Sequence, residues 1–121
     1  MTFSRLATGR IGESLASKYL RKKGFKILTQ NFRAGKTEID IIAEKQGKIH
    51  FIEVKTRSSN IKGKPYEAVG GRKISHLLTT ATFFLLQSGK KGHKLSLDVI
   101  SILLDRANKI QSIQYFENIN S

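Results

Sequence analysis

The stretches TEIDIIA at residues 37–43 and FIEVK at residues 51–55 each set charged side chains into an otherwise apolar run. Ionised carboxylates and lysines are rarely buried unless they are paired or bind a metal ion. Alternate residues of a strand share a face, so Glu53 and Lys55 lie together if the second stretch is a strand. If the two strands pair around the short turn between them, the Asp40 carboxylate converges on this pair. The two stretches therefore predict a hairpin that carries a site for a metal ion and a phosphate.

The charge of the chain indicates a polyanionic partner. Its 121 residues include 22 Lys and Arg against 9 Asp and Glu, a formal net charge of +13. Nucleic acid is favoured over a membrane surface, because no segment joins a basic face to a Trp- or Phe-rich apolar face. A ribosome-like protein that coats RNA is the simpler alternative.

Four acidic residues argue against simple coating. They fall where they could line one site, and they are Glu13, Glu38, Asp40 and Glu53. A passive anion binder would gain nothing from negative charge placed there. The acids therefore favour a catalytic site.

The length and composition predict one globular domain over residues 1–117, with residues 118–121 as a frayed tail. Cysteine is absent and the three histidines are scattered, so any metal is expected to be a hard cation on oxygen ligands. No apolar run approaches the roughly 20 residues that span a bilayer, and the first residues lack the apolar core of a signal peptide. We therefore expect a cytoplasmic protein without membrane contact.

Hydrophobic periodicity predicts an α/β order of elements. The expected elements are a helix over residues 6–23, strands over 25–32, 38–43 and 49–55, a helix from 74 to a stop at Gly89, and a hairpin over 94–104 and 109–116. Glu13 falls at the edge of the apolar arc of the first helix, so it should border the core, with an ordinary exposed glutamate as the alternative. Asp98, set in an apolar strand, is expected to be structural and to pair with a Lys or Arg.

A polar, basic segment at residues 56–65 follows the predicted third strand and is expected to form a mobile loop. Its Arg57, Lys62 and Lys64 are placed to grip a phosphate backbone, and a solvated linker is the alternative. Lys73, just ahead of the apolar stripe of the second helix, could reach a phosphate or lie on the surface as an ordinary lysine.

The acids and Lys55 suit phosphodiester hydrolysis. Mg²⁺, with Mn²⁺ as its substitute, activates water and neutralises phosphoryl charge, but it binds weakly unless carboxylates converge. Asp40 and Glu53 would hold the ion, and Lys55 would orient or deprotonate the attacking water. Glu13 from the first helix and Glu38 from its place beside Asp40 could each reach the same site.

Five short motifs span most of the chain. They are G-x-x-G-E-x-x-A-x-x-Y-L from Gly9, G-F-x-I-L-x-x-N-x-R from Gly24, E-I-D-x-I-A from Glu38, F-I-E-V-K-x-R from Phe51 and P-x-E-A-V from Pro65. Together they resemble the bacterial YraN-like family of small endonuclease-like proteins. Two positions depart from the family, Thr37 where Gly is common and Ser96 where Arg is frequent.

The resemblance implies a place in the PD-(D/E)xK nuclease superfamily, near archaeal Holliday-junction resolvases. It implies a single restriction-endonuclease-like α/β domain, in which helices flank a mixed central sheet. Carried over by position, Glu13 matches the helix acid and Asp40 the motif Asp. Glu53 and Lys55 match the E-x-K pair, and Lys73 matches a helix position that is often basic or polar.

Two functions of different class remain open. The first is a Mg²⁺-dependent endonuclease that acts on DNA, including branched or recombination intermediates. The second is an accessory module that binds nucleic acid without turnover. The intact Asp40, Glu53 and Lys55 favour the enzyme, because a site without turnover has no physical reason to keep carboxylates that repel phosphate. The sequence leaves open whether DNA or RNA is bound, whether a homodimer forms, and whether a branch-migration helicase is a partner.

Overall fold

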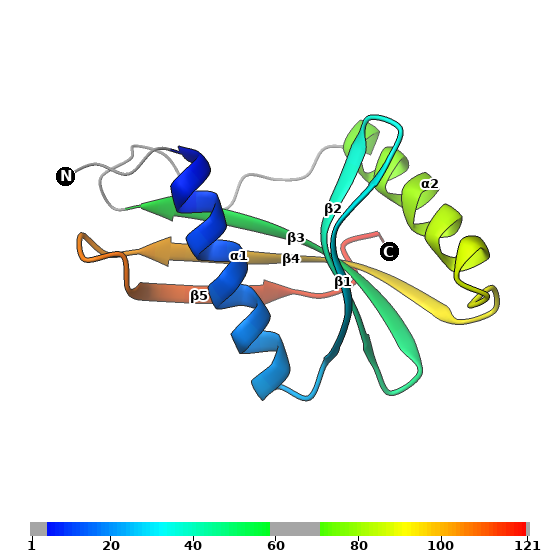
Figure 1. The fold of residues 1–121 in the computed structure, drawn as a ribbon, viewed down its shortest axis with the longest axis horizontal. Helices are drawn as coiled ribbons and strands as arrows, with labels where there is room; N and C mark the ends of the chain where they lie inside the picture. Colours follow the sequence, from blue (N-terminus) through cyan, green and yellow to red (C-terminus); the bar gives the residue numbers. More distant parts are fainter. Residues whose placement is uncertain (1–4, 59–70, 121) are drawn as a thin grey trace.

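A mixed five-stranded sheet with a helix on each face makes up the computed structural model, which describes residues 5–58 and 71–120 (Figure 1). The elements follow in the order α1 (Arg5–Lys22), β1 (Lys26–Ala34), β2 (Thr37–Lys45), β3 (Lys48–Ser58), α2 (Gly71–Gln87), β4 (Lys94–Leu104) and β5 (Ile110–Phe116). This architecture confirms the predicted fold class, a single α/β domain whose mixed sheet is flanked by helices.

The strands lie in the order β1-β2-β3-β4-β5, which is also their order along the chain. Neighbours are antiparallel except for β3 and β4, which are parallel. A parallel pair needs a long crossover, and α2 lies within the crossover between β3 and β4. The predicted last hairpin, β4 and β5, does widen the sheet at its edge.

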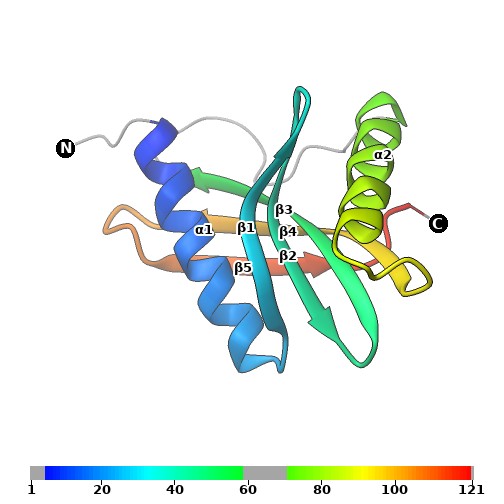
Figure 2. The ribbon, with the colours of Figure 1, turned by 45° about the vertical axis from the view of Figure 1, so that its right-hand side comes forward.

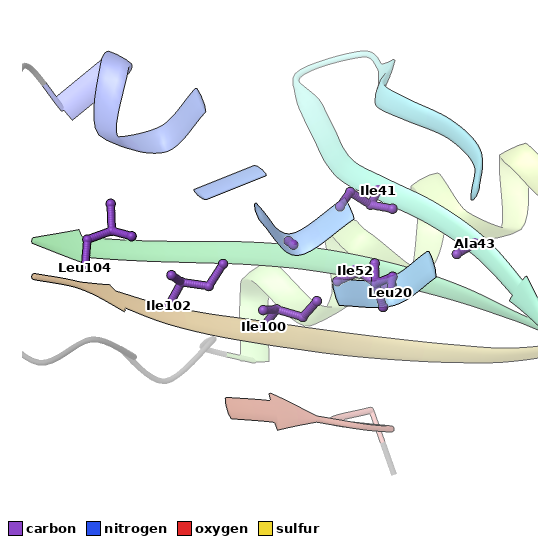
Figure 3. Close-up of a cluster of buried hydrophobic side chains, with 8 residues drawn as sticks. Leu20, Ile41, Ala43, Ile52, Ile100, Ile102 and Leu104 are labelled. Carbon is purple, nitrogen blue, oxygen red and sulfur yellow. The ribbon is translucent and has the colours of Figure 1, made fainter. Parts of the chain in front are cut away.

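Two hydrophobic clusters, one on each side of the sheet, hold the helices. On the α1 side the helix residues Ala16 and Leu20 pack against buried strand residues (Figure 3), namely Ile41, Ala43, Ile52, Ile100, Ile102 and Leu104. On the α2 side Leu77, Ala81 and Leu85 pack against the opposite set, namely Ile39, Ile42, Ile49, Phe51 and Leu97. Because β2 and β3 are covered on both faces, their apolar residues form continuous runs rather than a clean alternation.

Both helices end at the glycines that the sequence predicted. Gly24 has φ of 92°, and the N–H of Phe25 donates to the carbonyl of Leu20 at 3.0 Å. Gly89 has φ of 72°, and the N–H of Lys90 donates to the carbonyl of Leu85 at 2.8 Å. These bonds satisfy carbonyls of the last helical turn, and the left-handed backbone that makes them possible favours glycine.

The hairpin of β1 and β2 twists strongly as it leaves the rest of the sheet, and Figure 2 shows it rising beyond β3. Asn31, within β1, has a left-handed φ of 54°. In β2, Ile39, which pairs with Phe32, packs on the α2 side, whereas Ile41, which pairs with Gln30, packs on the α1 side. The regular alternation of faces is therefore interrupted at Asp40, which lies between these two isoleucines.

The structure corrects the prediction of a loop from residue 56. Strand β3 continues to Ser58, because its parallel pairing with β4 extends as far as Ser58 and Leu104. Arg57 is therefore a strand residue rather than part of a mobile loop. Lys62 and Lys64 lie outside the described residues.

Residues 118–120, expected to be frayed, are joined to β4 by three hydrogen bonds. The N–H of Asn118 donates to Asp98 Oδ1 at 3.0 Å, and the N–H of Ile119 donates to the carbonyl of Leu97 at 2.7 Å. The N–H of Leu97 in turn donates to the Asn120 side chain at 3.0 Å.

Neither described helix is long and apolar enough to cross a membrane.

Candidate active site

Asp40 and Glu53 face each other where β2 and β3 separate. The last registered pair of these strands is Ile41 with Ile52, so Asp40 and Glu53 stand one step further along. The backbone N–H of Val54 donates a 2.7 Å hydrogen bond to Asp40 Oδ2. The carboxylate thus takes an N–H group at the point where the ladder opens, and this bond fixes its position between the strands.

The Asp40 carboxyl is poised to take up a proton near neutral pH. Burial raises its pKa to about 7, and the nearby charges of Glu53, Glu13 and Glu38 act in the same direction. The hydrogen bond from the Val54 N–H opposes this rise but does not cancel it. A carboxylate held this way gains from a cation beside it, because a cation favours the charged form.

Glu53 is largely buried, with 13% of its side chain exposed. Its Oε1 accepts a 2.9 Å hydrogen bond from Lys73 Nζ and lies 3.7 Å from Lys55 Nζ. Its Oε2 is buried and accepts no hydrogen bond from any described residue. A buried carboxylate oxygen without a donor is costly, so a cation or a further donor beside this atom would be favourable.

Lys73 holds its proton firmly in this arrangement. Burial alone would lower its pKa, but the hydrogen bond and the negative charge of Glu53 outweigh burial and raise it. The alternative of an ordinary, unengaged surface lysine therefore does not describe Lys73. It is about half exposed and joins α2 to Glu53, the one acid of β3.

Glu13 and Glu38 are linked by Asn31. With the Asn31 amide turned to satisfy its neighbours, its nitrogen donates to Glu13 Oε1 at 2.9 Å and to Glu38 Oε1 at 3.1 Å. Arg33 forms an ion pair with Glu38 from the other side. Burial raises the pKa of Glu13, and the charges of Glu38 and Glu53 add to the rise.

A close approach of α1 to β3 brings Glu13 to this site. A Cβ atom on Gly12 would lie 1.8 Å from Thr56 Oγ1 and 2.7 Å from Thr56 Cβ. Only glycine fits there, so the residue before Glu13 lets the helix lie directly on the strand. Glu13 itself is half-buried, as the sequence predicted for a residue that borders the core.

An open hollow of about 380 Å³ connects the acids of β2 and β3 with α2. Its lining residues are Lys36, Thr37, Glu38, Asp40, Glu53, Lys73 and His76. Asp40, Glu53, Lys55 and Lys73 are thus brought together as a group. Glu13 joins them through Asn31 and through its charge, and Arg57 follows Lys55 by two positions on β3, which places both on one face of the strand.

The sequence reasoning assigned no role to Asn31, Lys36 or His76. Asn31 occurs in one of the family motifs, but no periodicity or spacing indicates that its backbone is left-handed. Asn adopts this conformation more readily than most residues, which is the only local signal. Lys36 and His76 come from a turn and from the exposed face of α2, and only the folded structure brings them to one hollow.

The donors at the site suit a hard cation, although the carboxylates do not yet form a closed set. Among residues 5–58 and 71–120, no three His, Asp or Glu side chains converge closely enough to hold a metal ion as they stand. The donorless Glu53 Oε2 and the raised pKa of Asp40 nevertheless favour the binding of a cation beside these two carboxylates. Asp40 and Glu53 are therefore the residues that could hold Mg²⁺ or Mn²⁺.

Asp98 belongs to a separate hydrogen-bond network with a structural role. The prediction that Asp98 pairs with a Lys or Arg is wrong for the described residues. Its carboxylate accepts from His50 Nδ1 at 2.6 Å, from Ser96 Oγ at 2.6 Å and from the Tyr115 hydroxyl. Burial would raise the Asp98 pKa, but these donors and the Asn118 N–H hold it below its usual range. Asp98 is fully enclosed, so polar donors from its own strand and from the two neighbouring strands take the place of a long basic side chain.

The mixed sheet, the helix on each face and the carboxylates at the opening of β2 and β3 define a single-domain α/β protein. Its architecture is consistent with a restriction-endonuclease-like fold. The chain belongs to the uncharacterised protein family UPF0102, whose family model matches residues 12–102. This confirms the resemblance to the YraN-like family.

Relatives in this family match the chain over most of its length. A UPF0102 protein of Moorella thermoacetica is 40% identical over 114 residues, which cover 94% of this chain and 95% of the relative. A UPF0102 protein of Syntrophomonas wolfei is 46% identical over 106 residues, with 87% and 92% covered. A third, from Chlorobium phaeobacteroides, is 41% identical over 106 residues, with 88% and 83% covered.

Proposed function

We propose that this protein is a divalent-metal-dependent endonuclease that hydrolyses phosphodiester bonds in DNA. The observation that carries the proposal is the buried, donorless Glu53 Oε2 beside Asp40, with the Lys55 ammonium on the same strand face. Two acids and a lysine where β2 and β3 separate have no evident structural purpose, because burial and then the charge of Glu53 raise the pKa of Asp40. Branched or recombination intermediates are the DNA class that the family resemblance suggests.

Asp40 and Glu53 would hold a Mg²⁺ ion, which when bound supplies positive charge to the phosphoryl oxygens and activates water for attack. The remaining steps fall to the side chains. The Val54 N–H keeps the Asp40 carboxylate in place, and Lys73 orients Glu53 through Oε1. These fixed bonds mean that little reorganisation is needed when the phosphate arrives.

Lys55 is the group placed to act on the reacting atoms. Its ammonium stands on the strand face of Glu53, where it can orient the water and offset the charge that builds on the phosphate. Attack of the water on phosphorus breaks the bond to the leaving oxygen, which takes up a proton as it departs. The water loses its proton in the same reaction, so the products are a phosphate monoester and a free hydroxyl.

A second candidate is a nucleic-acid-binding accessory module without turnover. It is favoured by the finding that no three acidic or histidine side chains converge for a metal within the described ranges, 5–58 and 71–120. The two candidates share a phosphate-binding surface and differ in whether the site assembles around a cation.

The test is incubation of the purified protein with linear duplex, single-stranded, flapped and four-way DNA in Mg²⁺, Mn²⁺ or EDTA. We expect strand scission in the presence of either metal and none in EDTA. Binding to these substrates without scission in any metal would overturn the enzyme and leave the accessory module.

A further inference from the structure

A second hollow, of about 300 Å³, is lined by residues of α1 and β1, and Glu13 is one of them. Its wall on α1 includes Arg10, Lys18 and Arg21, and Gln30 contributes from β1. We call this hollow the α1–β1 groove. The two elements that form it can be followed side by side in Figure 2.

The cations of the α1–β1 groove are not neutralised by the protein. Within residues 5–58 and 71–120, no ion pair joins Arg10, Lys18 or Arg21 to an acid, and all three are exposed. By contrast, Arg33 is paired with Glu38 and Lys73 with Glu53. The groove therefore holds an excess of positive charge, with three cations and the one acid Glu13 among its lining residues, in a chain that already carries +13.

Helix geometry aligns these cations. At 3.6 residues per turn, Arg10 and Arg21 fall roughly 20° apart around the helix and about 16 Å apart along it, with Lys18 between them along the axis. A single phosphate group is much shorter than this ridge, so the ridge is long enough to contact more than one phosphate of a nucleic-acid backbone. A row of separated cations suits a continuous phosphate backbone better than a single small anion.

The groove also offers a polar group that has no partner. Ser17 Oγ is buried within the groove wall and makes no hydrogen bond with any described residue. Hydroxyl groups and arginines are common contacts to phosphate in protein–DNA interfaces.

The groove leads to the proposed active site. Glu13 lines the α1–β1 groove, Glu38 lines the hollow with Asp40, and Asn31 bonds to both glutamates. A phosphate chain that enters the acidic region needs cations close by to offset carboxylate repulsion, and the α1 face supplies them next to Glu13.

We propose that the α1–β1 groove binds the phosphate backbone of a nucleic-acid strand and directs it past Glu13 to the acids of β2 and β3. Arg10, Lys18 and Arg21 contact its phosphates. The direction of the strand rests on the proposed function, whereas the binding itself does not. Single strands and duplexes share this chemistry, and the test separates them.

The test measures binding in EDTA, where cleavage is absent, for wild type and two triple variants. The groove variant carries Arg10→Gln, Lys18→Gln and Arg21→Gln. The matched control carries Lys91→Gln, Lys94→Gln and Lys109→Gln, which are exposed and outside the groove. Both variants lose three charges, which lowers the formal net charge from +13 to +10.

We expect the groove variant to flatten the slope of log K against log salt by roughly 0.9 per lost contact on a duplex, or roughly 0.7 on a single strand. The control variant should change the slope by less than the amount expected for the loss of one phosphate contact. Equal slopes for the two variants would overturn the proposal, because they would show a general attraction of charge. Stronger groove-dependent binding to poly-glutamate than to DNA would also overturn it, in favour of an acidic protein partner.

Acetylation of the wild-type protein gives a second readout that does not depend on how the variants fold. DNA should protect Lys18 from acetylation and leave Lys91 reactive. Equal reactivity of Lys18 with and without DNA would contradict the proposal. If DNA protects Lys18 but is not cleaved, the groove proposal stands and the proposed endonuclease activity is rejected. If DNA is cleaved but does not protect Lys18, the endonuclease activity stands and the groove proposal is rejected.

Discussion

Gly12 on α1 and Thr56 on β3 lie so close that a methyl group on Gly12 would be 1.8 Å from the Thr56 hydroxyl oxygen. This contact brings α1 directly against the strand that carries Glu53 and Lys55. The contact determines how far Glu13 reaches toward Asp40. A small residue in a helix thus controls the geometry of a charged site.

Gly12→Ala should therefore destabilise the protein by about 1–3 kcal/mol and weaken any activity that needs Glu13, because the helix must move away from β3. Gly9→Ala is the matched control, since nothing lies within 4 Å of its added methyl group. Replacing a helical glycine with alanine stabilises by roughly 0.5–1 kcal/mol when there is room. Thermal unfolding of the two variants checks this, and equal effects would show that the close contact is unimportant.

The raised pKa of Asp40 makes the stability of the metal-free protein depend on pH. The folded-state pKa of about 7 lies above the ordinary value of 3.8, so the native state binds a proton that the unfolded state does not. Stability in EDTA should increase as the pH falls from about 7 toward 4, and should level off above pH 7.

Asp40→Asn should remove this dependence and raise stability at alkaline pH, on the order of 2–4 kcal/mol. The asparagine oxygen still accepts the Val54 N–H, so the hydrogen bond is kept. Chemical denaturation across the pH range measures the effect, with Glu44→Gln on the same strand as the control. Parallel pH profiles for wild type and Asp40→Asn would contradict the assignment.

Asp98 should behave in the opposite way. Asp98→Ala leaves the donors of His50, Ser96 and Tyr115 without their acceptor, and each unsatisfied group costs roughly 1–3 kcal/mol. Because the folded-state pKa of Asp98 is lowered, its contribution is present above its ordinary pKa and is lost as the pH falls through the lowered value. A melting temperature for Asp98→Ala equal to that of the wild type would exclude a structural role.

Asn31 can be separated into its backbone and its side chain. Asn31→Gly keeps the left-handed φ of 54° at little cost but removes the amide that joins Glu13 to Glu38. Asn31→Ala removes the amide and adds strain of about 1–2 kcal/mol. We expect both variants to lose activity. Only the alanine variant should also lose folding stability through the backbone strain. Full activity in the glycine variant would show that the amide bridge has no functional role.

The sequence predicted the elements and the pairing of β2 and β3, because these depend on local signals. Apolar periodicity located both helices, Gly24 and Gly89 ended them, and the acids in apolar runs indicated an exceptional site. The pairing also followed from the short turn between the two strands. The pairing of β2 with β3 led to the expectation that Asp40 lies near Glu53. In the structure the two residues stand one step beyond the last registered pair of these strands.

The remaining features depend on contacts between distant segments. The extension of β3 through Arg57 follows from its ladder with β4, about 45 positions later, which no local pattern contains. Two donors to Asp98, His50 on β3 and Tyr115 on β5, are distant in sequence, so these partners could not be predicted from the residues around Asp98. The bridge through Asn31 needs a backbone conformation that appears only when the hairpin twists.

The most direct test of a metal-dependent active site is the single-turnover rate of DNA cleavage in Mg²⁺ by wild type, Glu53→Gln and Glu44→Gln. Glu53→Gln removes the charge at the donorless carboxylate, and loss of one such group typically lowers the rate by about 10²–10³. Glu44→Gln changes an acid outside the site and should leave the rate unchanged. We predict cleavage by wild type and Glu44→Gln, and strong loss in Glu53→Gln and in EDTA. Equal rates for all three proteins, or undiminished cleavage in EDTA, would contradict a metal-dependent active site at Glu53.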